Sequence, residues 1–353
     1  MTTRRDLKSI IRDRQCKTGE SYTAARVHVM RERAQLLGIP DEPTPAERPT
    51  RVEAAVLKVG TASARIRVLG EDGQITLRSR DVWKIAPGHI ITARIEKRWT
   101  FGGDAYASGR IEDARIDVAR LGLVPLPLTG GELEDLRACY EPVRPPDPYA
   151  QLWRKLTARP RPWYEMDEIA WAAFPGDEPD ECPTDEAIML KERGDTAGAR
   201  EILMNVVLRD LRCLDAHAHL GNLVFDHWPE HALVHYEIGV RIGELSLPPP
   251  FDGVLPWSSL YNRPFLRCLH GYGLCLWRLG RTDEAVRVFE RGLALNPNDN
   301  QGARFCWDDV RAGLTWEAAQ LPERFAASLV FKYLVRQLER MADGSRKNGK
   351  SQG

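Results

Sequence analysis

Five of the eight histidines lie close together, between positions 217 and 235. Three of them, His227, His231 and His235, follow one another at intervals of four residues. Imidazoles spaced in this way on one face of a helix are a common means of holding zinc. However, Pro229 is expected in the first turn of a helix, which leaves His227 outside it, and no glutamate completes a zinc-protease motif. We therefore expect neither a metal ion nor a cofactor.

Thiols are the next group of reactive side chains. The seven cysteines are scattered and odd in number, and no Cys-x-x-Cys pair occurs. This distribution favours buried thiols in a reducing cytoplasm over a disulfide framework or a zinc site. Cys268 and Cys275 lie seven residues apart in a helical segment, so we expect them in its core. No phosphate-binding loop, dinucleotide-binding, serine-hydrolase or kinase motif is present, which predicts a protein without catalytic activity.

Charge is unevenly distributed along the chain. Residues 1–120 hold 23 Lys and Arg against 16 Asp and Glu, a net charge of +7, and the remainder holds 27 against 34, a net of −7. The first residues carry a charge every few positions, unlike a signal peptide. No apolar run reaches the roughly 18 residues of a membrane helix. We expect a cytoplasmic protein without a membrane partner, and nucleic acid is a possible partner only for the basic N-terminal part.

Residues 1–38 are expected to form a helical hairpin, followed by a proline-rich linker at 39–50. Two apolar stripes recur at helical spacing, formed by Leu7, Ile10 and Ile11 and then by Tyr22, Ala25 and Val29. Gly19 ends the first helix and Ser21 begins the second. A helix-turn-helix would use basic side chains against phosphate, namely Arg26, Arg31 and Arg33. The favoured interpretation is a docking hairpin with a solvated arginine-rich face.

Between residues 51 and 117 the hydrophobic period changes from 3.6 to 2. Strand-like runs occur at 52–59, 62–69, 74–79, 89–101 and 104–111. Gly102 and Gly103 suit a two-residue hairpin turn that needs positive φ. Five short strands in about 65 residues predict a small closed β-barrel of the OB or SH3-like type. One face of the fourth run is expected to carry Ile91, Ala93, Ile95, Trp99 and Phe101, with Lys97 as an exception.

Small barrels of this type bind single-stranded nucleic acid through aromatic side chains that lie beside basic ones. The last two strand-like runs contain such a set: Arg94, Lys97, Arg98, Trp99, Phe101, Tyr106 and Arg110. The alternative is that the aromatic residues belong to the barrel core and the basic residues to its solvated face.

Residues 118–182 are interrupted by prolines and are expected to connect two domains. Short helices are predicted at 131–140, 149–158 and 164–174. The tryptophans of this connector, Trp153, Trp163 and Trp171, indicate that these helices pack on a core.

The segment from Leu269 to Asp299 carries a specific pattern. Its positions are Leu269-x2-Tyr272-Gly273-x2-Leu276, then Ala285-x3-Phe289, then Pro297. This pattern resembles the tetratricopeptide repeat, in which small residues let two helices approach closely. Weaker copies are His217-x2-Leu220-Gly221-x2-Val224 with Ala232-x3-Tyr236, and Ala199-x3-Leu203. The resemblance implies a helical solenoid at 183–341, with an inserted loop at 247–264 and a capping helix. The polar composition of residues 342–353 predicts a disordered tail.

In this superfamily the first helix of each repeat lines a groove. By resemblance, the groove would be lined by Asp215, Asn222, Arg267, His270, Trp277, Arg278, Arg304, Asp308 and Arg311. Four arginines and a tryptophan suit an acidic or carboxylate-ended peptide, with the Trp277 indole as its anchor. The alternatives are internal pairs, such as Arg304 with Asp308, and an inserted loop that covers Trp277.

Two functions remain open at this point. The first is a non-catalytic protein–protein interaction protein, which binds a peptide or partner segment in a tetratricopeptide-like groove. The alternative is a nucleic-acid-associated adaptor, whose barrel and N-terminal hairpin bind RNA or DNA.

Overall fold

A computed structural model describes residues 4–19, 22, 25–26, 28–30, 32, 49–135, 148–167 and 183–320. The chain forms two compact units, Met1–Thr50 and Arg51–Gly353. Most of the linker expected at 39–50, the capping helix and the tail lie outside the described residues. Within the described residues, none of the helices combines the length and apolar character needed to cross a bilayer.

The first unit contains helix α1 (Arg4–Thr18), which ends where expected, at Gly19. Gly19 has a positive φ of 70° and its N–H donates to the Gln15 carbonyl at 2.9 Å. Ile11 is buried against Ala25 and Val29, as a helical hairpin requires. Ile10, however, is 46% exposed and does not share the packed face, because neighbouring residues of a helix point about 100° apart. Ser21, Arg31 and Arg33 lie outside the described residues.

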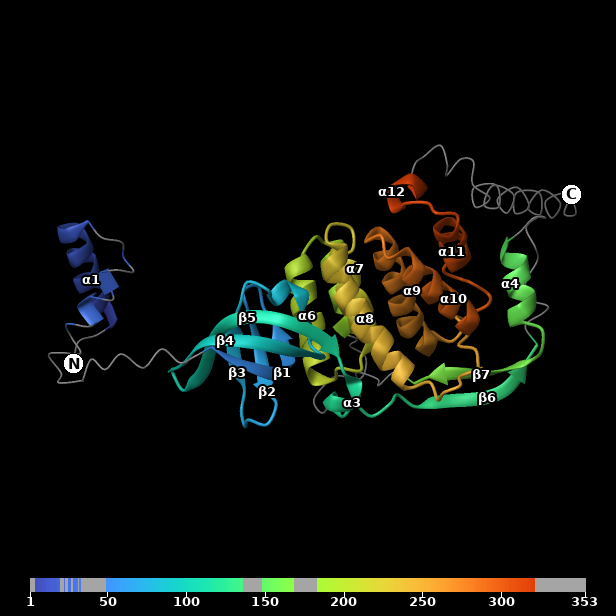
Figure 1. The fold of residues 1–353 in the computed structure, drawn as a ribbon, viewed down its shortest axis with the longest axis horizontal. Coiled ribbons are helices and arrows are strands. Elements are labelled where there is room, and N and C mark those ends of the chain that lie inside the picture. The colour runs from blue at the N-terminus through green and yellow to red at the C-terminus, as the bar shows by residue number, and fades with distance from the viewer. Residues whose placement is uncertain are drawn as a thin grey trace, which may run out of the picture. The chain divides into compact units, whose positions relative to one another are not determined.

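The second unit begins with a closed five-stranded barrel in the order β1-β2-β3-β5-β4, which confirms the predicted architecture (Figure 1). Its strands are β1 (Thr50–Val59), β2 (Ser63–Val68), β3 (Ile75–Arg78), β4 (His89–Phe101) and β5 (Asp104–Ile116). Strands β3 and β5 pair in parallel, and β4 and β5 form a long antiparallel hairpin. Gly102 and Gly103 close that hairpin with φ of 62° and 91°, as the turn requires.

A β-bulge changes which face of β4 points into the barrel. Ile95 pairs with Gly109, but Lys97 pairs with the next residue of β5, Ser108, so Glu96 is an extra residue. One extra residue moves every following side chain to the opposite face. The prediction that Trp99 and Phe101 share the inward face of Ile91, Ala93 and Ile95 is therefore wrong. Beyond the bulge Lys97, Trp99 and Phe101 all point outward, and Phe101 is 62% exposed.

The connector contains a two-stranded sheet that the helical prediction missed. Helices α3 (Val118–Leu121) and α4 (Pro148–Leu156) occur there, the second close to the predicted helix at 149–158. Strands β6 (Leu128–Glu134) and β7 (Arg161–Met166) pair antiparallel, so the helices predicted at 131–140 and 164–174 are wrong at 131–134 and 164–166. Gly130 explains the difference, since its φ is 108° and a Cβ there would lie 2.6 Å from the Trp163 carbonyl.

Nine helical segments follow in the described part of the second half. They are α5 (Pro183–Glu192), α6 (Thr196–Arg209), α7 (Leu214–Val224), α8 (Pro229–Leu245), η4 (Leu260–Asn262), α9 (Arg263–Arg278), α10 (Thr282–Leu295), α11 (Ala303–Arg311) and α12 (Trp316–Ala319). Neighbouring helices lie side by side (Figure 1). A Cβ on Gly273 would lie 2.7 Å from the Phe289 ring, which is the close approach that the repeat pattern predicts.

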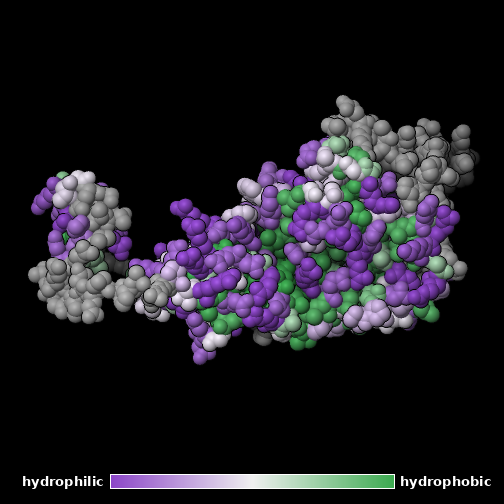
Figure 2. All heavy atoms as spheres, in the orientation of Figure 1, coloured by the Kyte–Doolittle hydropathy of each residue, from purple (hydrophilic) through white to green (hydrophobic). Residues whose placement is uncertain are grey.

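The barrel and the helical array share one buried core. Val56, Ile66 and Ile91 of the barrel belong to the same cluster as Leu203 of α6 and Leu220 of α7. The short helix η1 (Val82–Lys84) of the barrel contacts α8. Hydrophilic atoms dominate the barrel surface in Figure 2, whereas apolar atoms show between the helices of the array. The barrel therefore packs against the first two helix pairs through buried apolar side chains.

Candidate partner-binding surface of the helical array

The first predicted groove residues that the structure brings together are Asp215 of α7 and Arg267 of α9. The Arg267 guanidinium donates to the Asp215 carboxylate at 2.9 Å, and His219 lies 3.4 Å from the same carboxylate. Burial raises the pKa of Asp215, but the combined effect of His219 and Arg267 in the opposite direction is larger. The pKa of Asp215 therefore lies below its ordinary value. Arg267 is thus partly neutralised within the protein. Asn222, farther along α7, accepts a hydrogen bond at its Oδ1 atom from the Tyr236 hydroxyl group, and the two oxygen atoms are 2.6 Å apart.

Trp277 and Arg278, the predicted anchor, are covered by the chain itself. The Trp277 indole is 4% exposed, donates to the Leu314 carbonyl at 2.8 Å and packs edge-on against Trp316 at 5.2 Å. The Arg278 guanidinium lies between Phe225 and Trp316, 4.9 and 5.4 Å from their ring centres, and donates to the Phe225 carbonyl. The position of Trp277 therefore differs from the expected open anchor, because the segment that leads into α12 packs over it. The hydrogen bond and the ring contact of the Trp277 indole are both made with residues 314–316, outside the inserted loop.

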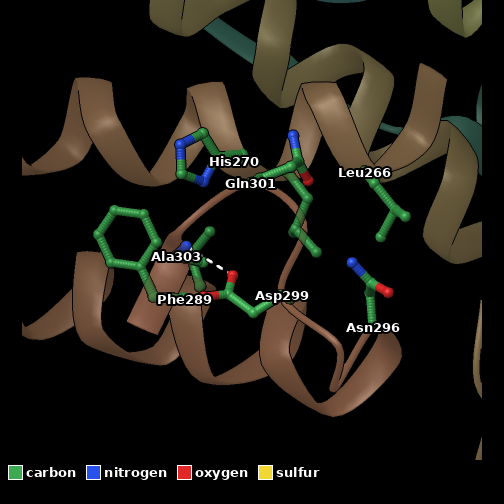
Figure 3. Close-up of a pocket in the computed structure, with 10 residues that line it drawn as sticks. Leu266, His270, Phe289, Asn296, Asp299, Gln301 and Ala303 are labelled. Atoms are coloured by element: carbon green, nitrogen blue, oxygen red, sulfur yellow. Dashed lines mark hydrogen bonds between the residues drawn. The ribbon is translucent and has the colours of Figure 1, made fainter. Parts of the chain in front are cut away.

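His270 lines a small hollow between α9, α10 and the loop before α11 (Figure 3). The hollow has an empty volume of about 270 Å³, including its mouth, and also contains Asn296, Asp299 and Gln301. The buried Nδ1 atom of His270 has no protein partner. Burial lowers the pKa of His270 to about 4, and burial raises the pKa of Asp299 to about 6. Because an orphaned buried nitrogen is usually satisfied by water, the hollow suits an ordered water molecule more than a peptide side chain.

Two of the three predicted groove residues of α11, Arg304 and Arg311, lie against aromatic rings. Arg304 lies 3.5 Å from Asp299, and its guanidinium stacks on Phe305 at 4.8 Å. Arg311 stacks on Trp307 at 4.3 Å. Asp308 is only partly buried. Both stacked arginines gain cation–π contacts and lose part of their freedom to clamp a carboxylate.

The most exposed apolar surface of this region lies on the inserted loop, where the sequence predicted no site. Leu260 and Tyr261 are 66% and 52% exposed. Trp257 comes three residues before Leu260 in the same loop, and the guanidinium groups of Arg263 and Arg267 lie 5.3 and 5.9 Å from its ring centre. We call Trp257, Leu260, Tyr261, Arg263 and Arg267 the insertion patch. The adjoining Leu260-Tyr261 pair in a proline-rich insertion was the available sequence signal.

Buried polar contacts fix the position of the insertion patch. The Asn262 side chain is fully buried, accepts the Met166 N–H at 2.9 Å and donates to the carbonyls of Tyr164 and Pro256 at 2.9 and 3.1 Å. Arg161, also buried, donates to the carbonyls of Asp252, Gly253 and Ala294 at 2.8 to 3.0 Å. Strand β7 therefore clamps both ends of the inserted loop.

Asn262→Ala is expected to lower the free energy of unfolding by about 2 kcal/mol, because it leaves buried backbone groups without partners. The inserted loop should also become more sensitive to limited proteolysis between 248 and 261. Ser258→Ala, at an exposed position of the same loop, is the matched control. Equal stability and equal cleavage of the two variants would show that the Asn262 clamp does not hold the loop.

The predicted nucleic-acid residues of the barrel are distributed over the ends of β4 and β5. Arg98 donates twice to Glu71, at 2.8 and 3.1 Å, and Arg110 lies 3.9 Å from Glu96. Trp99 stacks on Tyr106 at 5.7 Å. The remaining members, Arg94, Lys97 and Phe101, are exposed. In the first unit, Arg26 is exposed.

The histidines that suggested a metal site occupy different environments. His231 lies between the rings of Trp83 and Trp228, at 5.2 and 6.2 Å, and His227 contacts Trp228 outside the helix. His235 is buried near His217, with ring centres 6.4 Å apart. No group of three His, Cys, Asp or Glu side chains in the described part of the chain is arranged to hold a metal ion.

Comparison with protein families gives a match to the tetratricopeptide repeat over residues 266–299. This range includes most of α9 and all of α10. The predicted resemblance of the C-terminal half to this superfamily is thereby confirmed. Such repeats generally bind proteins and are generally non-catalytic. No curated protein matches the chain.

Proposed function

We propose that the chain is a non-catalytic cytoplasmic protein that binds a peptide or segment of a partner protein, with the insertion patch as its anchor. The observation that supports a protein partner is the tetratricopeptide repeat formed by α9 and α10. The patch adjoins the N-terminal end of α9, the first helix of that repeat. A partner that lies along α7 and α9 would therefore reach it.

The insertion patch has the composition of a binding hot spot. Interface energy is concentrated in Trp, Tyr and Arg side chains that become desolvated on binding. Trp257 and Tyr261 supply flat apolar surface at a small cost in conformational entropy. Arg263 and Arg267 provide donors beside it, of which Arg267 is already shared with Asp215. This combination favours a partner segment with an apolar residue next to an acidic one.

Tyr261→Asp combined with Leu260→Asp is expected to abolish capture of the partner, because both changes place charge on apolar contact surface. Each single change should weaken the affinity for a purified partner about 30-fold, the equivalent of about 2 kcal/mol of binding free energy. The full chain would be immobilised, incubated with nuclease-treated extract, and the bound proteins quantified by mass spectrometry. Calorimetry with the purified partner would then give its affinity for each variant.

Leu208→Asp is the matched control, since Leu208 is 49% exposed on α6, away from the insertion patch. It should retain the partner at the wild-type level. Retention of the partner by the double variant would contradict the proposal that the insertion patch is the binding site. Loss of every partner on nuclease treatment would sink the proposal of direct protein binding.

A further inference from the structure

The outer face of the barrel carries a stack of aromatic and guanidinium groups from three strands. Trp99 of β4 and Tyr106 of β5 are cross-strand partners, with ring planes 12° apart and centres 5.7 Å apart. The Arg78 guanidinium of β3 lies 5.5 Å from the Trp99 ring centre and 5.7 Å from that of Tyr106. Phe101 extends this surface toward the β4–β5 turn and is 62% exposed. We call Arg78, Trp99, Phe101 and Tyr106 the stacking face.

The stacking face continues into a row of cations on the same outer surface. Arg94 and Arg110 are direct cross-strand partners, and both are exposed. Lys97 pairs with Ser108 between them and the aromatic rings. Like charges directly opposite each other on a sheet are unfavourable, and Glu96, 3.9 Å from Arg110, offsets only part of this repulsion. An anion bound between Arg94 and Arg110 would relieve the remainder.

We propose that this outer face binds single-stranded nucleic acid. Unpaired bases stack on Trp99 and Phe101, and the phosphates that follow lie on Lys97, Arg94 and Arg110. A duplex hides its base faces, so a flat aromatic surface beside a line of cations favours a single strand. The repeated cations along β4 and β5 match a polyanion better than a peptide with a single acidic group. Stacking and charge recognise every base, so little sequence preference follows.

The proposal is tested with the full chain and a fluorescein-labelled dT12 or rU12 oligonucleotide, by fluorescence anisotropy at several salt concentrations. Trp99→Ala is expected to weaken binding about 5- to 150-fold, the range for loss of one stacked base. Arg94→Ala should lower the slope of log affinity against log salt by about 0.7, since it removes one phosphate contact. Trp83→Ala is the matched control, because Trp83 is 47% exposed on η1, outside the stacking face.

Several outcomes would overturn the proposal. The first is that the Trp99→Ala variant, shown by circular dichroism to be folded, binds the oligonucleotide as tightly as the Trp83→Ala variant does. Others are salt-independent binding by the wild-type chain, or competition by duplex DNA as strong as by dT12. Competition by polyglutamate together with unchanged Trp99→Ala affinity would identify a protein-binding cationic surface instead. The Leu260→Asp variant should bind the oligonucleotide normally, so failure here is separate from failure of the proposed protein-binding function.

Discussion

Trp277→Ala is expected to lower the free energy of unfolding by about 3 to 5 kcal/mol, because it removes a buried indole from the core. The side chain is 4% exposed and contacts Trp316, and its N–H donates to the Leu314 carbonyl. Its loss leaves a cavity and an unpaired carbonyl, and also weakens the attachment of α12. Urea denaturation followed by circular dichroism measures the change.

Tyr261→Ala is the paired control for this experiment, since Tyr261 is 52% exposed. It should change the free energy of unfolding by less than about 0.5 kcal/mol, while it lowers the affinity for the partner. The expected pattern is therefore stability loss at one aromatic residue and affinity loss at the other. A Trp277→Ala variant that kept wild-type stability and lost only its partner would show that the indole is an open anchor in solution.

Acidification is expected to destabilise the protein steeply between pH 6.5 and pH 4. Burial lowers the pKa of His89, His217 and His270 to about 4, and lowers that of His235 well below its ordinary value of 6.5. Each imidazole is protonated in the unfolded chain before the folded chain accepts the proton. Their stabilising effect is thus complete above pH 6.5 and is lost as the pH falls toward 4. For His89, His217 and His270, the stability that each imidazole contributes falls by roughly 1 kcal/mol per pH unit in that window, and by about 3 kcal/mol over the whole window.

The measurement is the free energy of unfolding at pH 7.5, 6, 5 and 4.5. His217→Gln should flatten its dependence on pH by the contribution of one imidazole, whatever its effect on stability at pH 7.5. His227→Gln, at an exposed position, should keep the wild-type slope. His217→Gln with an unchanged slope would mean that His217 is solvated in the folded protein. His89 of the barrel and His217 of α7 interact electrostatically, so the acid effect should act on the core that these two parts share.

Local sequence patterns predicted much of the fold, because turn formation and hydrophobic periodicity each depend on only a few neighbouring residues. The change to period 2, with Gly102 and Gly103 at a turn, predicted a barrel whose strands begin within two residues of the expected positions, although β5 ends five residues later than expected. Gly273 and Phe289 predicted how closely α9 and α10 approach. Pro229 opens α8, as its fixed φ allows. These features depend on backbone sterics and hydrophobic period, both of which are visible in a short window.

The candidate site was less accessible from local patterns. The only local signal for Leu260 and Tyr261 is that an apolar pair adjoins in a proline-rich insertion, and this signal does not show that the two side chains stay exposed. The resemblance placed Trp277 and Arg278 on the first helix of a repeat, but Trp316, almost forty residues away, covers both. Exposure is a property of the whole packed chain, so a helical repeat pattern alone does not determine which of its side chains meet a partner.

Local patterns are enough to predict that a small barrel precedes a tetratricopeptide-like helical array, because alternation, turn residues and small-to-large contacts specify each element. Which side chains of these elements point outward depends on contacts between segments that are distant in sequence. The extra residue Glu96 turned Trp99 and Phe101 outward, since a bulge is defined by the register of two strands. Pairing with β7 turned 128–134 into a strand, because a sheet satisfies its backbone with hydrogen bonds from a segment distant in sequence.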